Sequence, residues 1–167
     1  SKVVAADVDA SNGVVHVVDA VIPVPSVPTF AVANPDFSIL VQALTRSDLA
    51  ANYASVLSGP GPFTVFAPTN AAFVALLSEL GVAALKDIPA ATLEAVLTYH
   101  VASGNVLAGS LTEGQQVTTL QKGNFTVRLA GGAKITDANN RVINIIATDI
   151  QGGNGVVHAI DKVLLPK

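Results

Sequence analysis

The chain contains no cysteine, no methionine and no tryptophan, and aromatic residues make up only 5% of it. Without cysteine it can form no disulfide, no thiolate metal site and no cysteine nucleophile, although the redox compartment stays undecided. Charged residues amount to 13%, the net charge is -3, and no cluster of Lys and Arg stands out. This balance excludes a nucleic-acid partner and an anionic membrane surface.

Long apolar runs are also missing, so the sequence predicts no membrane-spanning helix. Neither a signal peptide nor an initiator Met is visible, and we therefore expect a mature or excised piece of a longer protein. The chain has 167 residues, half of them hydrophobic. That length and composition favour a single globular domain with a sizeable core.

The most informative feature is an internal repeat. Residues 3–23, "VVAADVDASNGVVHVVDAVIP", align without a gap with residues 145–165, "IIATDIQGGNGVVHAIDKVLL". In this alignment His16 matches His158 and Asp19 matches Asp161. Each copy has two β-rich arms around an Asn-Gly pair, which is typical of a β-hairpin. The sequence therefore predicts the same hairpin at both ends of the chain.

Between the copies, periodicity changes from helical to alternating. Three prolines in residues 23–30 indicate an extended, semi-stiff linker. Helical spacing or turn signals then predict helices or helical turns over 35–44, 47–57, 69–81, 82–89 and 91–101. Breakers and alternation predict a strand within 59–68, a strand over 124–130 and a hairpin over 133–150. Helices first and strands afterwards indicate an α+β fold.

The sequence also predicts the capping residues of two helices and the inward-facing residues of several elements. Ser47 is the expected N-cap of the second helix, with its apolar residues inward. Thr69 or Asn70 should cap the third helix and Gly81 should end it. The expected inward residues of the second and last helices and of the 124–130 strand are Leu49, Tyr53, Val56, Leu57, Leu93, Val96, Leu97, Val101, Phe125, Val127 and Leu129.

Three segments, in this order, resemble the conserved boxes of the fasciclin domain family. "GPFTVFAPTNAAF" resembles its first box, "LTYHVASGNV" its Tyr-His segment, and "GGNGVVHAIDKVLLP" its second box. Their order and spacing match one complete domain over residues 30–167. Residues 1–22 resemble the last hairpin of a preceding fasciclin repeat, and residues 23–29 would then be the linker.

The resemblance implies a fasciclin-like fold, with N-terminal helices packed on a twisted, mostly antiparallel β-sheet or wedge. It also implies a secreted or surface-attached adhesion module in tandem with sister repeats, without catalysis or a cofactor. Expected partners are neighbouring repeats and cell-surface or matrix proteins or glycans. An alternative from another class is a small-molecule or glycan carrier with a polar-lined cleft between helices and sheet.

His158 and Asp161 invite a metal or acid-base interpretation, as do His16 and Asp19. Residues three apart in a strand point to opposite faces, so each pair should diverge. We therefore expect no metal site. His158 should instead be a half-buried strand residue with one ring nitrogen hydrogen-bonded.

Tyr99 and His100 end an amphipathic helix, and His100 should face the core. A buried neutral His needs partners for both nitrogens, and we expect them near Thr69 and Asn70, because the family places these boxes together. A structural role is favoured for His100. The alternative is partner contact, since the Tyr-His segment is linked with integrin binding in animal members.

Residues Lys86, Asp87 and Ile88, in "LKDIP", loosely resemble another integrin-binding motif of animal members, Asn-Lys-Asp-Ile-Leu. The outer positions differ here, with Leu85 and Pro89, so integrin binding itself is not carried over. The segment stays a candidate partner contact together with Tyr99 and His100.

No catalytic residue is expected, since no nucleophile elbow, phosphate loop, dinucleotide fingerprint or calcium loop occurs, and "DANN" reads as a turn. Asn124 begins an Asn-Phe-Thr sequon on the polar face of its strand, a glycosylation site if the source is a eukaryotic secreted protein. The localisation implied by the resemblance is extracellular or at the cell surface. Residues 3–22 form an apolar hairpin without a home sheet, which should dock elsewhere on its own domain or pair with a neighbouring molecule. Pairing between molecules is favoured, because symmetric self-pairing satisfies the open edge on both chains.

Overall fold

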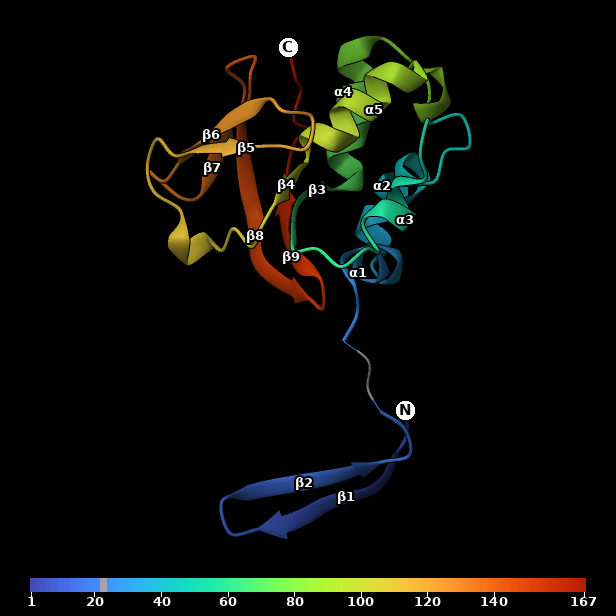
Figure 1. Ribbon diagram of the computed structural model, residues 1–167, viewed down its shortest axis with the longest axis vertical. Coiled ribbons are helices and arrows are strands. Elements are labelled where there is room, and N and C mark those ends of the chain that lie inside the picture. Colours follow the sequence, from blue (N-terminus) through green and yellow to red (C-terminus); the bar gives the residue numbers. More distant parts are fainter. Residues whose placement is uncertain (22–23) are drawn as a thin grey trace.

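The computed structural model describes residues 1–21 and 24–167, so predictions on Ile22 and Pro23 lie outside the described residues. In Figure 1 the N-terminal hairpin lies apart from a larger body of helices and strands. The hairpin consists of β1 (Val3–Ala10) and β2 (Gly13–Val18), which form their own two-stranded antiparallel sheet. The larger body contains a layer of helices and a seven-stranded sheet, which confirms the α+β class.

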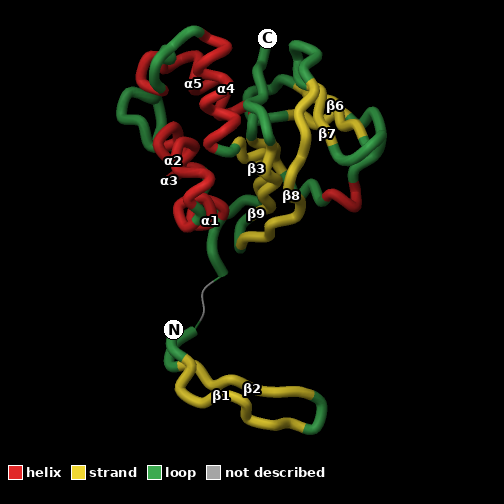
Figure 2. The backbone as a smooth tube through the Cα atoms, turned by 180° about the vertical axis from the view of Figure 1, so that it is seen from behind, coloured by secondary structure: helices red, strands yellow, loops and turns green. Residues whose placement is uncertain are grey.

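The helical layer is contributed by the first half of the body (Figure 2). Its elements are α1 (Val27–Ala33), η1 (Pro35–Phe37), α2 (Ser38–Leu44), α3 (Tyr53–Val56), α4 (Asn70–Leu80), η2 (Leu85–Asp87) and α5 (Ala90–Tyr99). A further 3-10 turn, η3 (Ala108–Ser110), lies among the strands. None of the helices in the described residues is both long and apolar enough to cross a bilayer.

Helix α4 has both of its predicted ends. Thr69 has extended backbone angles and its hydroxyl accepts a hydrogen bond from the N–H of Ala72, as an N-cap does. Gly81 ends the helix with φ 66°, in the left-handed region where glycine carries no steric cost. Local sequence signals alone are sufficient for this helix.

The predicted linker and the predicted second helix both need correction. Residues 27–29 begin α1, with Pro28 in its first turn, so the extended linker does not reach residue 29. The second helix shrinks to the single turn of α3, capped by Asn52 and not by Ser47. Asn52 Oδ1 accepts from the N–H of Ser55, three residues later. An Asn side chain that bonds a nearby backbone N–H in this way favours the start of a helix over its interior. Val56, expected inward, is 44% exposed.

The large sheet has the strand order β4-β3-β9-β8-β7-β6-β5. Its strands are β3 (Phe63–Pro68), β4 (Val101–Ser103), β5 (Gln116–Thr118), β6 (Asn124–Arg128), β7 (Lys134–Thr136), β8 (Val142–Gly152) and β9 (Gly155–Ile160). Only β3 and β9 pair in parallel, which confirms a mostly antiparallel sheet. A bridge between Ala102 and Thr119 brings the two edges together, so the sheet curls towards a barrel.

Strand β9 lies at the centre of the domain, and all six of its residues are buried. Strands that are buried on both faces read as continuous apolar runs, and "GVVHAI" fits that description. Gly155 allows the close approach of β3, because a Cβ at this position would lie 2.0 Å from the carbonyl oxygen of Phe63. The second copy of the repeat is therefore the strand on which the domain is assembled.

Two hydrophobic clusters lie on opposite faces of β3 and β9. One cluster joins the helices to the sheet and includes Phe37, Leu40, Leu44, Val65, Phe73, Leu76, Leu93, Val96, Leu97, Val101 and Val157. The other fills the curled sheet and includes Phe66, Tyr99, Phe125, Val127, Ile135, Ile143, Ile160 and Leu164. Burial of one such side chain contributes about 1.5–3 kcal/mol. Val101 is buried as predicted, but it belongs to strand β4 and not to the last helix. Leu129, which was expected inward, is 37% exposed because β6 ends at Arg128.

The N-terminal hairpin reproduces the geometry of β8 and β9. Val3 pairs with Val18 as Ile145 pairs with Ile160, and both hairpins carry the same two register shifts. At the matching bulges Asp7 and Asp149 both have φ 56°. Yet all of residues 1–21 are exposed, whereas every residue of β9 is buried. The copy has the fold of a closing hairpin without the surroundings that bury one.

Candidate functional site

The three boxes that carry the family resemblance meet at the centre of the domain. Strand β3, from the first box, lies between β4, from the Tyr-His segment, and β9, from the second box. The N–H of Phe66 donates to the carbonyl of His100 at 2.9 Å, and the N–H of Thr69 donates to the carbonyl of Ile160 at 3.2 Å. The candidate site is therefore this junction and the surface around it.

His100 is buried, with 3% of its surface exposed, as the sequence predicts. Its Nδ1–H donates to the carbonyl of Val96 at 2.7 Å, and its Nε2 accepts from the N–H of Leu164 at 2.9 Å. The prediction of partners near Thr69 and Asn70 is wrong: both partners are backbone groups of other segments. Burial lowers the pKa of His100 from 6.5 to about 4, so the ring is neutral at neutral pH.

Asn70 joins the start of α4 to the helices before it. Its Oδ1 accepts from the N–H of Ile39 at 2.9 Å. Its Nδ2 donates to the carbonyl of Pro35 at 2.9 Å and to the hydroxyl of Ser38 at 3.0 Å. An amide that is used three times in this way positions helices and has little capacity left for a ligand.

Tyr99 performs a similar task on the other side of the junction. Its ring is fully buried and its hydroxyl donates to the carbonyl of Asn124 at 2.7 Å, which ties α5 to β6. The ring packs edge-on against Phe125, with centroids 6.3 Å apart. Burial raises the pKa of the Tyr99 hydroxyl, which keeps it a hydrogen-bond donor.

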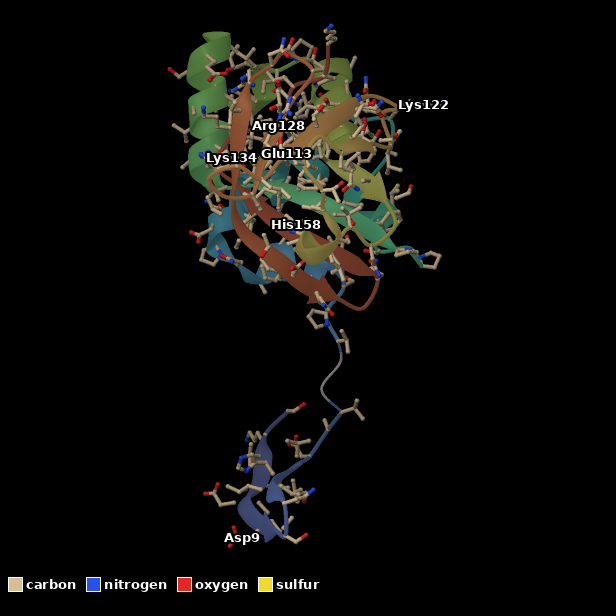
Figure 3. The ribbon with its side chains drawn as sticks, turned by 90° about the vertical axis from the view of Figure 1, so that its left-hand side faces the viewer. Asp9, Glu113, Lys122, Arg128, Lys134 and His158 are labelled. Atoms are coloured by element: carbon tan, nitrogen blue, oxygen red, sulfur yellow. The ribbon has the colours of Figure 1, made fainter. Side chains whose placement is uncertain are left out.

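His158 is more deeply placed than the sequence indicates (Figure 3). It is fully buried rather than half-buried, and both ring nitrogens are bonded rather than one. Nδ1 accepts from the N–H of Asp149 at 3.3 Å, and Nε2–H donates to the carbonyl of Val106 at 2.7 Å. The ring also stacks on Phe66, with centroids 5.2 Å apart. The sequence predicts less burial because it does not show that β9 lies between β3 and β8 in the folded sheet.

Asp161 turns away from His158 to a different partner. Its carboxylate accepts from the backbone N–H of Asn144 at 2.8 Å and from the Nδ2 of Asn144 at 2.6 Å. In the described part of the chain, no three His, Asp or Glu side chains gather closely enough to hold a metal ion. Asp161 therefore closes the base of the β8–β9 hairpin.

Asp137 is a structural residue that sequence reasoning missed. Its Oδ1 accepts from the N–H groups of Asn139 and Arg141, at 3.0 and 2.9 Å, as a turn residue does. Its Oδ2 accepts in addition from the N–H of Leu165, at 3.2 Å. The "DANN" motif indicated the turn, but no local signal could reveal the bond to the C-terminal segment.

The turn Lys86–Ile88 is the part of the predicted site that lies at the surface. Lys86 and Asp87 are exposed, whereas Ile88 is buried. Arg46 holds the turn from below: its Nη1 donates to the carbonyls of Leu85 and Ile88, at 2.8 and 3.0 Å. Asp87 closes the turn by accepting from the N–H of Ala84 at 2.9 Å. The result is a rigid charged turn.

Beside this turn is a groove of about 380 Å³, lined by Gln42, Arg46, Ser47, Asp48, Leu85 and Lys86. The guanidinium of Arg46 pairs with the carboxylate of Asp48 at its rim. Of the five candidate contact residues, only Lys86 and Asp87 are available to a partner in this fold. Ile88, Tyr99 and His100 would have to leave the core first.

Two further grooves flank the C-terminal residues. One, of about 450 Å³, is lined by residues that include Tyr99, Gly123, Asn124 and Pro166. The other, of about 570 Å³, has a more apolar lining that includes Leu80, Ala95, Leu165 and Pro166. The first groove lies between the end of α5 and the start of β6, and its lining includes the polar residues Gln121, Lys122 and Asn124.

Asn124 is exposed on the outer face of β6, as the sequon requires. On the same strand Arg128 Nη1 donates to Glu113 Oε1 at 3.2 Å, and Figure 3 labels both residues on this side together with Lys134. The face is polar, because the alternate residues Phe125 and Val127 point into the curled sheet. The side chain of Asn124 is therefore exposed, with its Nδ2 3.5 Å from Gln116 Oε1.

The histidines of the described residues are held in place by backbone hydrogen bonds. In residues 1–21 and 24–167, each His ring is hydrogen-bonded to backbone groups and none is paired with a Ser or Thr hydroxyl. Every buried side-chain nitrogen and oxygen in the described residues has a hydrogen-bond partner. The buried polar side chains are thus satisfied within the fold.

Comparisons with known proteins agree with this geometry. The family model of the fasciclin domain matches residues 35–166. The uncharacterized protein sll1735 of Synechocystis is 36% identical over 141 residues, which are 84% of this chain and 98% of that protein. Human periostin is 35% identical over 94% of this chain, but the match spans only 18% of periostin.

Among solved structures, a FAS1 domain pair from the insect cell adhesion molecule Fasciclin I matches with a TM-score of 0.68 and 24% identity. The match covers 98% of this chain and 59% of the insect chain. At this identity the likeness establishes the fold. Because 98% is covered, the match extends into the N-terminal hairpin.

Proposed function

This chain belongs to the fasciclin domain family, and from that membership we propose that it is a non-catalytic extracellular module for cell adhesion or matrix interaction. Its partners are cell-surface or matrix proteins or glycans, which it binds through exposed surface. The insect structural neighbour is a cell adhesion molecule, which supports the proposal. The extracellular or cell-surface location follows from the same proposal.

One observation carries the proposal. The motif side chains form hydrogen bonds that hold the fold together, while a charged turn that is hydrogen-bonded to Arg46 remains exposed. Asn70, Tyr99, His100 and His158 each bond backbone groups of distant segments. Lys86, in contrast, is exposed on a turn that Arg46 holds in place. A turn whose backbone is already held by hydrogen bonds loses less entropy on binding than a free loop does.

We also propose that the chain is part of a tandem array and that residues 1–22 close a preceding repeat. The identical register, bulges and positive φ of the two hairpins support this assignment. So do two further hydrogen bonds: the N–H of Asp7 donates to His16 as that of Asp149 does to His158. Relatives much longer than this chain, such as periostin, also align with most of it.

The test is binding of the full chain to a glycan array and to a panel of purified matrix proteins. Lys86→Ala should weaken any binding at least tenfold. Lys162→Ala removes the same charge from an exposed residue elsewhere and should leave binding unchanged. Equal binding by Lys86→Ala and the parent would contradict the role of the turn, and no binding at all would contradict the adhesion proposal.

A carrier of small molecules or glycans is the alternative. It predicts that soluble saccharides raise the melting temperature by binding the folded state. The grooves on this molecule are open at the surface, whereas a carrier would be expected to enclose most of its ligand. The surface-binding proposal is therefore preferred.

A further inference from the structure

The N-terminal hairpin has the backbone features with which β8 and β9 hold their place in the domain. Gly13 takes the position of Gly155, where a Cβ would lie 2.0 Å from the carbonyl oxygen of Phe63 in β3. At the base of the hairpin Asp19 Oδ1 accepts from the N–H of Lys2 at 2.8 Å, the same distance as for the matching pair of the C-terminal hairpin. By its backbone alone, the N-terminal hairpin would fit beside a strand such as β3.

Shared geometry creates a hazard in an array of repeats. Exchange of equivalent elements between neighbouring units is a characteristic way in which repeat proteins misfold. The present chain already contains two such hairpins and one body of helices and strands that could accept either. Because the backbone does not distinguish the hairpins, the side chains in which they differ must do so.

The first difference is at Ala159. This residue pairs with Ala67 of β3 on one side and with Ala147 of β8 on the other. It is 4% exposed and belongs, with Ala67, to the cluster that joins the helices to the sheet. Its counterpart in the N-terminal hairpin is Val17. Two additional carbon atoms at this position would meet a densely packed core and displace its neighbours.

The second difference is at Gly152, beside the start of α1. A Cβ at this position would lie 3.0 Å from the carbonyl oxygen of Pro25 and 3.2 Å from the nitrogen of Val27, both backbone atoms. Pro25 cannot withdraw freely, because its carbonyl accepts from the N–H of Gly153 at 2.9 Å. The counterpart of Gly152 is Ala10, whose Cβ would therefore push against the start of α1.

A third difference has the opposite sign. Ile160 is fully buried in the cluster that fills the curled sheet, and its counterpart Val18 is smaller by one carbon atom. Val18 at this position would leave a gap in the core. By contrast, residues 156–158 read Val-Val-His in both hairpins, so the centre of the strand fits equally well.

Resting on the tandem array proposed above, we propose that each closing hairpin is specific for its own repeat. Positions 152, 159 and 160 exclude the N-terminal hairpin from this domain. The partner of that hairpin is a fasciclin body with more room at the first two of these positions and less at the third. The shared backbone features allow a hairpin to close a repeat, and the volumes at the three positions select which repeat it closes.

A transplanted hairpin tests the proposal in the full chain. In the transplant chain, residues 145–160 have the sequence of residues 3–18. The matched chain has the same transplant but keeps the native residues at positions 152, 159 and 160. The control chain changes only exposed positions of the same hairpin, with Ile146→Val, Thr148→Ala and Gln151→Asp.

Urea denaturation followed by circular dichroism measures the equilibrium constant of unfolding for each chain. The transplant should raise this constant about 100-fold or more, because overpacking at two positions and a gap at the third all destabilise the fold. The matched chain should stay within about tenfold of the parent, and the control within about threefold. A transplant chain as stable as the parent, or equal losses in the transplant and matched chains, would overturn the proposal.

Two further measurements keep the outcomes distinct. If the transplant chain does not fold, Ala159→Val alone should raise the constant about tenfold, and an unchanged constant would again overturn the proposal. Amide hydrogen exchange of residues 156–160 in the matched chain tests the array itself. If these amides exchange freely while those of α4 and α5 stay protected, the sequence of residues 3–18 cannot close a repeat, and the tandem assignment fails instead.

Discussion

Acidification should destabilise the domain through His100, and the size of the effect can be worked out. The folded chain takes up a proton on this ring only near pH 4, because burial lowers its pKa, whereas the unfolded chain does so near pH 6.5. Between these values acid favours the unfolded state. At about 1.4 kcal/mol per pKa unit, roughly 3 kcal/mol of stability is present above pH 6.5 and lost by about pH 4.

Protonation has a structural consequence that explains why it is resisted. A second ring proton would sit on Nε2, which accepts the N–H of Leu164. Two donors would then face each other in a buried site. The ring would have to move, and the C-terminal segment would lose its attachment to α5.

Urea denaturation followed by circular dichroism at several pH values measures this effect. His100→Gln carries no titrating ring, so the stability gap between parent and variant should shrink by about 3 kcal/mol from neutral pH to about pH 4. His16→Gln, which changes an exposed ring, is the matched control and should follow the parent. If the free energies of unfolding of the parent and His100→Gln change in parallel with pH, His100 is not the source of the acid sensitivity.

Three other predictions follow from the structure. Asn70→Ala should lower the free energy of unfolding by about 1–3 kcal/mol, because the N–H of Ile39 loses its acceptor; an unchanged urea midpoint would contradict this. The full chain should self-associate in light scattering through its exposed hairpin, while a chain that begins at Val24 stays monomeric; two monomers would end that hypothesis. Secretion from a eukaryotic host should add a glycan that Asn124→Gln removes, and an unmodified parent would exclude the site.

Elements with local signals were predictable from the sequence. Helix α4 has a cap residue, an apolar run and a final glycine, and each signal acts within a few residues. The hairpin of β8 and β9 was predicted from the Asn154-Gly155 pair, but its turn lies one residue earlier, at Gly153 and Asn154, and Gly155 pairs with Gly152 in the strand ladder. The repeat was visible because both copies kept their apolar pattern and the His and Asp positions.

The partners of the buried polar groups were not predictable. His100 bonds Leu164, and His158 bonds Val106, across 64 and 52 positions of the chain. Such bonds depend on the parallel pairing of β3 with β9, which leaves no periodic trace in either strand. Asp137 was recognised only as a turn residue for the same reason, since its bond to Leu165 joins distant segments.

In the proposed function, buried motif residues maintain the fold while exposed residues bind the partner. Binding of the parent, Lys86→Ala and His100→Gln to the same matrix and glycan panel tests it, at neutral pH and at a temperature where all three are folded. His100→Gln should bind like the parent, and Lys86→Ala should bind more weakly. Loss of binding in a fully folded His100→Gln, with Lys86→Ala unaffected, would contradict it.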